Sequence, residues 1–276
     1  MLKNEFKITF NLTIIIAVLA AIASAGGFFI KGLYRDNLLV TSGWYGNDLV
    51  TLFVAVPLLA GAMFYAGRGS LRAQLVWLGM LAYMLYNYAF YLFGAAFNGF
   101  FPVYVALFTL SIFALIYGLT ALDVNSVKSG FRAGTAVKWI SGYMVFIALG
   151  LSTVYLAQWI VFVVTGQLPP IVTLTEHPTS VVFALDLSLV VPVLALAALW
   201  LWQRRSWGYA LAVIANTKGA VYMLALCAVT ASAVHSGASD DLSQTALWGF
   251  IGAGCLAASL VLLANLQTTE ISERKK

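Results

Sequence analysis

Charged side chains are scarce in this chain of 276 residues: 9% are Asp, Glu, Lys or Arg, whereas 62% are hydrophobic. A soluble domain carries roughly 25% charged residues, so a surface this poor in charge must largely contact lipid. The polar segments between the long apolar runs are too short to form a soluble domain. We therefore expect one integral membrane domain over residues 1–276, with membrane lipid as its main partner. The basic residues are scattered over short loops and form no stripe, which argues against nucleic acid as a partner.

Histidine and cysteine are equally rare, with two residues of each. A catalytic zinc site usually needs three protein ligands, and both His177 and His235 lie in expected loops, so we expect no metal site and no cofactor. Cys227 and Cys255 lie in apolar segments at depths that differ by about 10 Å, which argues against a disulfide. The chain also lacks a G-x-S-x-G elbow and a P-loop. No catalytic residue can be named, and the sequence leans against an enzyme without excluding one.

Long apolar runs are what the chain has in abundance. A helix of roughly 20 apolar residues crosses the hydrocarbon core, and strands would be shorter and would alternate. The sequence thus predicts an all-α, polytopic transmembrane bundle with eight spans and both termini on one side. The first run is too long for a signal peptide and is expected to be a retained helix. The expected spans are 8–30, 49–67, 73–94, 102–122, 139–164, 181–202, 209–234 and 246–266.

Lys and Arg are distributed unevenly between the two sides of this bundle. Of the 15 such residues, 12 lie on the side of the termini, Lys31 and Arg35 lie on the other side, and Lys218 lies within a span. Because cytoplasmic loops carry the excess of Lys and Arg, we expect both termini in the cytoplasm. The 12 residues are Lys3, Lys7, Arg68, Arg72, Lys128, Arg132, Lys138, Arg204, Arg205, Arg274, Lys275 and Lys276.

Two segments resemble each other at an offset of 135 to 136 residues. Residues 56–60 (VPLLA) recur as 191–195 (VPVLA), and Tyr86 aligns with Tyr222. Both copies run in the same direction across the membrane, which predicts a parallel 4+4 repeat with half-repeats 1–135 and 136–276. The alternative is two ordinary proline-containing helices, each followed by a basic turn.

Two ionisable residues, Asp186 and Lys218, lie inside expected spans. A charge at the bilayer centre costs at least ~2.5 kcal/mol, so a partner, water or a ligand must offset it. Helix rise places the two residues roughly 8 to 16 Å apart in depth, so a direct salt bridge forms only at the short end of that range. A hydrated cavity joining them is the alternative with a function. A structural ion pair, or Lys218 snorkelling to the surface, is the alternative without one.

In the repeat, Thr51 would match Asp186 and Ala82 would match Lys218. The charges would then lie in one half only, which favours a specific site over a structural device that both halves need.

The third expected span is rich in tyrosine. Tyr83 and Asn87 share one helix face, and further tyrosines flank it. A buried hydroxyl needs a partner, so these residues could line a ligand pocket, or they could bond neighbouring helices and form an aromatic belt. The predicted ligand-binding residues are Asp186, Lys218, Asn87, Tyr83, Tyr86, Tyr91 and Tyr222.

A ridge of small residues marks the last expected span. Gly249, Ala253 and Ala257 are spaced for close helix packing or for a homo-oligomer face.

Several of these segments are familiar in combination. The segments 184–187 (ALDL), 191–192 (VP), 204–209 (RRSWGY) and 218–219 (KG) occur together with 85–91 (LYNYAFY) and 96–98 (AFN). With them the chain resembles an uncharacterised group of bacterial multi-pass membrane proteins, over a little more than half its length. The resemblance implies a bacterial inner (plasma) membrane location and no particular chemistry.

These observations favour a carrier or permease that takes a small amphiphilic molecule or ion through an outward-facing polar pocket. A ligand-binding or sensing membrane module would use the same residues without transport. A membrane enzyme acting on a lipophilic substrate would use Asp186 as a base and Lys218 as an electrostatic clamp.

Overall fold

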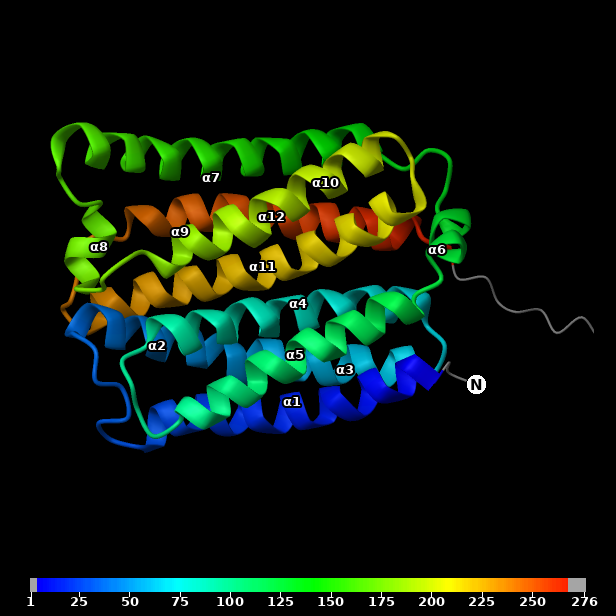
Figure 1. Ribbon diagram of the computed structural model, residues 1–276. Helices are drawn as coiled ribbons and strands as arrows, with labels where there is room; N and C mark the ends of the chain where they lie inside the picture. The colour runs from blue at the N-terminus through cyan, green and yellow to red at the C-terminus, as the bar shows by residue number, and fades with distance from the viewer. Residues whose placement is uncertain (1–3, 268–276) are drawn as a thin grey trace, which may run out of the picture.

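The computed structural model describes residues 4–267, with side chains from residue 6 onward. Lys3, Arg274, Lys275 and Lys276, four of the predicted basic residues, lie outside this range. The elements are helices, shown in Figure 1. In chain order they are α1 (Asn4–Phe29), α2 (Leu38–Val50), η1 (Thr51–Ala55), α3 (Val56–Gly67), α4 (Leu71–Gly94), α5 (Phe101–Ala121), α6 (Val124–Gly130), α7 (Val137–Thr165), α8 (Pro170–Thr175), α9 (Val181–Leu185), η2 (Asp186–Val190), α10 (Val191–Trp202), α11 (Ser206–His235) and α12 (Ser243–Asn265).

Within the described residues, eight helical stretches are long and apolar enough to cross a membrane. They are α1, the continuous helix α2–η1–α3, α4, α5, α7, the continuous helix α9–η2–α10, α11 and α12. The prediction of an all-α bundle with eight spans is therefore confirmed, and the chain is a multi-pass integral membrane protein.

The second span differs from its prediction. It was expected over 49–67 and runs instead over Leu38–Gly67. The added turns look like a polar loop in the sequence because they contain Ser42, Asn47 and Asp48. The structure buries all three in the bundle. Asn47 bonds to Asn87 and Asp48 to Tyr91, and the hydroxyl of Ser42 contacts that of Ser236; local patterns cannot show such distant partners.

Polar side chains fix where several helices begin. Asn37, Ser70 and Ser180 each precede a helix and accept a hydrogen bond from the backbone amide three residues further on. This is the usual N-cap arrangement, which satisfies an amide that has no partner within the helix. At the other end of α7, Gly166 takes the left-handed conformation with φ of 75°, which favours glycine because it has no side chain.

The helices α4 and α11 pack against each other in the middle of the bundle (Figure 1). Helices α1, α3 and α5 lie on the α4 side, and α7, α10 and α12 lie on the α11 side. A side chain at Gly46 of α2 would lie 2.4 Å from the carbonyl oxygen of Ala228 in α11, and one at Gly79 of α4 would lie 2.8 Å from Thr217 Cβ. These glycines let the backbones of the central helices approach closely. Among the eight spans, α4 is the most buried and α7 the least.

The two halves share unusual features at matching positions. The π-helical turns η1 and η2 begin at Thr51 and Asp186, at the predicted offset, and each is followed by Val-Pro. Proline has no amide hydrogen and disturbs the preceding turn, so the wider turn accommodates the expected irregularity. In addition, α2 contacts α11 while α9 contacts α4. We retain the parallel repeat as a proposal that these correspondences support.

The loops gather at the two ends of the bundle (Figure 1). We call one end the Asp36 end; it carries the loops 30–37, 95–100, 166–180 and 236–242. We call the other the Arg72 end; it carries the loops 68–70, 122–136 and 203–205.

Candidate functional site

Asp186 is the first residue of η2, and its carboxylate is buried with 4% of the residue exposed. Oδ1 accepts a hydrogen bond of 2.7 Å from the hydroxyl of Tyr86 in α4, and Oδ2 accepts one of 2.7 Å from Tyr155 in α7. The ring of Tyr155 stacks on Phe183 with centroids 4.2 Å apart, which holds the hydroxyl in place. No ion pair involves Asp186 within residues 4–267. Its hydrogen-bond donors are the neutral hydroxyls of these two tyrosines, and the Lys218 ammonium attracts it electrostatically without forming a salt bridge.

The hydroxyl of Tyr86 has a choice of two acceptors. Besides Asp186 Oδ1, the oxygen of Tyr222 lies 3.3 Å away. A phenol carries one hydrogen, so it bonds to only one of these oxygens at a time. Tyr86 can thus release the carboxylate without losing its own hydrogen bond.

Lys218 lies on α11, half-buried, with its ammonium against two aromatic rings. Nζ is 3.7 Å from the centroid of the Tyr86 ring and 4.4 Å from that of Tyr222. Ring faces attract a cation by ~0.5–2 kcal/mol each, but they satisfy none of its N–H groups. Within the described chain, no carboxylate pairs with this ammonium.

The geometry settles how Asp186 and Lys218 are related. They form no salt bridge, and Tyr86 joins them: its hydroxyl donates to Asp186 while its ring face receives Lys218. Beside them, Gly219 lets α12 approach so closely that an added Cβ would lie 2.9 Å from Cys255 Sγ. Cys255 and Cys227 are free thiols.

A second buried carboxylate, Asp48 of α2, was not predicted. It is 2% exposed and accepts hydrogen bonds from Tyr91 in α4, at 2.8 Å, and from Tyr34 in the loop before α2. A Cβ at Gly27 of α1 would lie 2.0 Å from Asp48 Oδ2, so only glycine fits there. The expectation that the charges lie in one half only is wrong, because Asp48 places a carboxylate in the first half, three residues before Thr51.

Tyr34 lies outside the spans and is itself buried. Burial and the neighbouring Asp48 carboxylate raise the pKa of its hydroxyl far above the usual value. The hydroxyl therefore stays protonated and remains a donor to Asp48.

Asn87 and Tyr83 belong to the surroundings of this second carboxylate. The amide nitrogen of Asn47 donates to Asn87 Oδ1 at 2.7 Å, and Asn87 donates to Thr51 Oγ1 at 3.5 Å. The hydroxyls of Thr51 and Tyr83 lie 2.9 Å apart. This chain of side chains ties α4 to α2 and η1.

The structure therefore divides the predicted ligand-binding residues between two places. One is the Asp186 site, formed by Asp186, Tyr86, Tyr155, Tyr222 and Lys218. The other is the Asp48 site, which comprises Asp48, Tyr34 and Tyr91 together with the neighbouring chain Asn47–Asn87–Thr51–Tyr83. Helix α4 serves both, because its tyrosines face opposite halves of the bundle.

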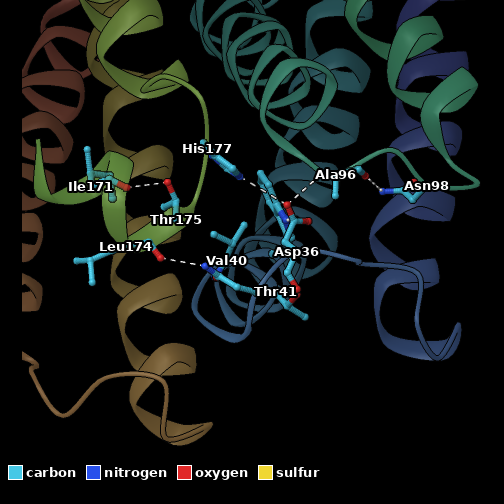
Figure 2. Close-up of polar contacts among 11 residues, drawn as sticks. Asp36, Val40, Thr41, Ala96, Asn98, Ile171, Leu174, Thr175 and His177 are labelled. Carbon is cyan, nitrogen blue, oxygen red and sulfur yellow. Dashed lines mark hydrogen bonds and ion pairs between the residues drawn. The ribbon is translucent and has the colours of Figure 1, made fainter. Parts of the chain in front are cut away.

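Loops from both halves meet above these sites at the Asp36 end. Figure 2 shows Asp36 between His177 and the backbone of Ala96. Asp36 Oδ1 accepts from the Ala96 amide at 3.0 Å and lies 3.6 Å from His177 Nε2, while Oδ2 accepts from Trp44 Nε1 at 3.0 Å. The side chain of His177 is 19% exposed. The loop that carries His177, expected from the sequence, thus packs on the first half.

Two surface cavities flank the first half of the bundle. One of about 430 Å³ at the Asp36 end is lined by residues that include Leu33, Asn98 and Gly99. One of about 360 Å³ at the Arg72 end is lined by residues that include Lys7 and Gly67. Neither is lined by a residue of the Asp186 site. An outward-facing pocket at that site stays a prediction.

The predicted ridge on α12 lies on the outside of the bundle. Gly249, Ala253 and Ala257 are all exposed, so they do not provide close packing between helices of one chain. A homo-oligomer face there stays a prediction.

Comparison of the chain with protein-family models, with curated proteins and with solved structures finds no match. The functional argument therefore starts from the Asp186 site itself.

Proposed function

We propose that this protein is a membrane carrier or permease for a small amphiphilic molecule or ion, which binds at the Asp186 site. The observation that carries the proposal is the ammonium of Lys218, which lies within a span against two rings and forms no salt bridge in the described residues. A charge kept at this cost marks a functional site by default. We infer that the missing partner is an anionic group of the substrate.

Tyr86 gives this site a way to respond to a ligand. An anion on Lys218 adds negative charge beside Tyr86, whose hydroxyl can turn between Asp186 and Tyr222. Release of Asp186 loosens the contact between α4 and η2, because the hydroxyl of Tyr86 is what joins them there. Wide π-helical turns are frequent at functional sites, and η2 would absorb the resulting movement.

We further propose that both termini face the cytoplasm and that the protein resides in a bacterial inner membrane. The described basic residues of the loops at the Arg72 end, such as Arg68, Lys128 and Arg204, support the orientation through the positive-inside rule. Single cysteines at Ser129 and Ser239, labelled from outside with an impermeant reagent in intact cells, test it. Labelling of Ser129→Cys and not of Ser239→Cys would contradict the orientation.

Flux through reconstituted protein tests the carrier. Octanesulfonate is a suitable probe because it is amphiphilic and keeps its charge, so it does not cross the bilayer as a neutral acid. We expect liposomes that contain the protein to take it up faster than empty liposomes, and Lys218→Met to abolish the difference. The matched control is Lys138→Met, since Lys138 is exposed and its Nζ lies 5.9 Å from the Trp202 ring.

Two results would contradict the carrier. Equal flux in liposomes with and without the protein, while octanesulfonate still binds tightly, would favour a binding or sensing module. Equal flux in the wild type and the Lys218→Met variant would show that the Asp186 site does not bind the transported group.

A further inference from the structure

The surroundings of Asp48 have a property that the carrier proposal does not use. Asp48 lies in the second span, is 2% exposed and has no cationic partner within residues 4–267. Leaving a carboxylate ionised and unpaired in such a place is costly, and binding a proton removes the charge. The local structure should then offer hydrogen-bond partners for both forms of the group.

Both forms of Asp48 can indeed be satisfied. The carboxylate accepts from Tyr34 and from Tyr91. The hydroxyl of Tyr91 also lies 3.4 Å from the carbonyl oxygen of Trp44. When Asp48 is protonated, its own O–H donates to the Tyr91 oxygen, and Tyr91 turns its hydrogen to Trp44.

A metal cation does not fit the same place. The backbone of α1 presses on the carboxylate so closely that a Cβ at Gly27 would lie 2.0 Å from Oδ2. The hydroxyls around Asp48, those of Tyr34, Tyr91 and Ser24 of α1, serve it as hydrogen-bond donors, whereas hard cations need several oxygen ligands around them. A proton needs neither space nor further ligands.

The cavity at the Asp36 end provides a short way to Asp48. Its wall includes Leu33, which precedes Tyr34 in the chain, and Asn98. Next to them the hydroxyl of Tyr104 is buried beside the side chains of Tyr34 and Asn98. These groups lead from Asn98 in the cavity wall to Tyr34, which donates to Asp48, so the polar partners that a water molecule needs are present along this route. The rings of Tyr104 and Tyr91 lie 5.2 Å apart.

We propose that Asp48 is a proton-binding site, separate from the Asp186 site, that exchanges its proton with water through the cavity at the Asp36 end. A hydronium ion in the cavity water gives up one proton: an O–H bond of the hydronium breaks and leaves neutral water, an O–H bond to a carboxylate oxygen of Asp48 forms, and the hydrogen of Tyr91 turns to the Trp44 carbonyl. The process runs in reverse on release.

The neighbours of Asp48 decide what its titration can depend on. The titratable groups that interact with it are tyrosines of the preceding loop, of α4 and of α5: Tyr34, Tyr83, Tyr88, Tyr91 and Tyr104. From α1 the chain presents Gly27. Helix α11 meets α2 through Ala228 and Val229. Because a phenol ordinarily titrates near pH 10, Asp48 is the group of this cluster that we expect to change its charge below that pH.

Infrared spectroscopy of the whole protein in lipid nanodiscs tests the proposal directly. A protonated carboxyl group gives a C=O stretching band that shifts in heavy water. We expect such a band to disappear as the pH rises, to be absent in Asp48→Asn and to persist in Asp186→Asn. The matched control is Asp241→Asn, because Asp241 is an exposed carboxylate that accepts a hydrogen bond from the Ser243 amide at the start of α12. A spectrum that Asp48→Asn leaves unchanged, in a variant with wild-type helicity, would overturn the proposal.

If Asp48→Asn does not fold, a second variant provides the test. Tyr34→Phe keeps the carboxyl group and removes one of its hydrogen bonds, so the band must change its frequency. An unchanged frequency would count against Asp48 as the source of the band.

The exchange route has its own test. Gly99 lines the cavity, and a Cβ there meets nothing within 4 Å, so Gly99→Trp fits and fills the opening. We expect hydrogen–deuterium exchange of the Asp48 band to slow about tenfold, which corresponds to a barrier raised by about 1.4 kcal/mol. Unchanged exchange would refute this route. The tests are independent of octanesulfonate flux, so failure of the carrier proposal leaves them standing.

Discussion

Replacing Lys218 by methionine tests whether this residue serves function or stability. A lysine near the bilayer centre costs ~2.5–3.5 kcal/mol on insertion scales. Against this stand two ring contacts of about 1 kcal/mol each for a half-buried ammonium, at 3.7 Å from the Tyr86 centroid and 4.4 Å from that of Tyr222. No salt bridge adds to the two favourable ring contacts. The net free energy of keeping the Lys218 charge in the bundle is therefore unfavourable. Methionine has a similar length and no charge, so Lys218→Met should stabilise the bundle by about 1 kcal/mol.

The measurement is reversible unfolding in mixed micelles with increasing denaturing detergent, followed by circular dichroism. Lys138→Met controls for the general effect of removing a lysine, because Lys138 is exposed and its contact with Trp202 is longer, at 5.9 Å. The control should change the free energy of unfolding by less than about 0.5 kcal/mol. A loss of more than about 2 kcal/mol for Lys218→Met would refute the reasoning, because it is the loss expected when a buried charge pair is broken.

Three further predictions concern packing, the Asp186 site and the thiols. Gly46→Ala should destabilise the bundle by about 1–3 kcal/mol, because its Cβ would lie 2.4 Å from a backbone carbonyl of α11, whereas Gly43→Ala, with 3.4 Å to a side chain, should be nearly neutral in the same unfolding assay. Tyr155→Phe should cost about 1–3 kcal/mol, since the carboxylate at the start of η2 loses one of its two hydroxyl donors; an unchanged midpoint would show that water replaces the hydroxyl. A maleimide should label Cys227 faster than Cys255 in the folded protein, because the first is half-buried and the second is buried; equal rates would contradict this packing of α12.

Most of the fold could be predicted because span length and apolarity are local properties. The exception is the first part of the second span, where Asn47 and Asp48 suggested a loop. Their partners, Asn87 and Tyr91, lie some 40 residues further along the chain, and a pattern along one helix cannot reveal them. One local signal was present: a pair of glycines at 26 and 27 on an apolar helix marks a close approach, of the Phe100 ring to Gly26 and of the Asp48 carboxylate to Gly27.

Most residues of the Asp186 site could be predicted from the sequence, but their arrangement in space could not. Helix rise gives the depth of Asp186 and Lys218 within the bundle, but their rotation about each axis depends on how the helices pack. The sequence therefore left direct contact open, and the structure places Tyr86 between them. Tyr155 was missed because most of its helix faces lipid, and its partner Asp186 lies 31 residues further along the chain; its ring also stacks on Phe183.

The use of tyrosine around both carboxylates explains how a chain with so little charge can keep two aspartates in its interior. An arginine or lysine partner would hold a carboxylate ionised permanently and would add a second charge to be buried. A phenol is neutral, donates to a carboxylate, accepts from a carboxylic acid and buries a large apolar ring. The two tyrosines of α4 that donate to the aspartates each have a second acceptor within reach, Tyr222 for Tyr86 and the Trp44 carbonyl for Tyr91. The two hydroxyls lie on the same helix, five residues apart in sequence, or ~7.5 Å along its axis. A rigid helix cannot move one hydroxyl without the other. A movement of α4 that follows a change of charge at one aspartate should therefore change the hydrogen bonds at both.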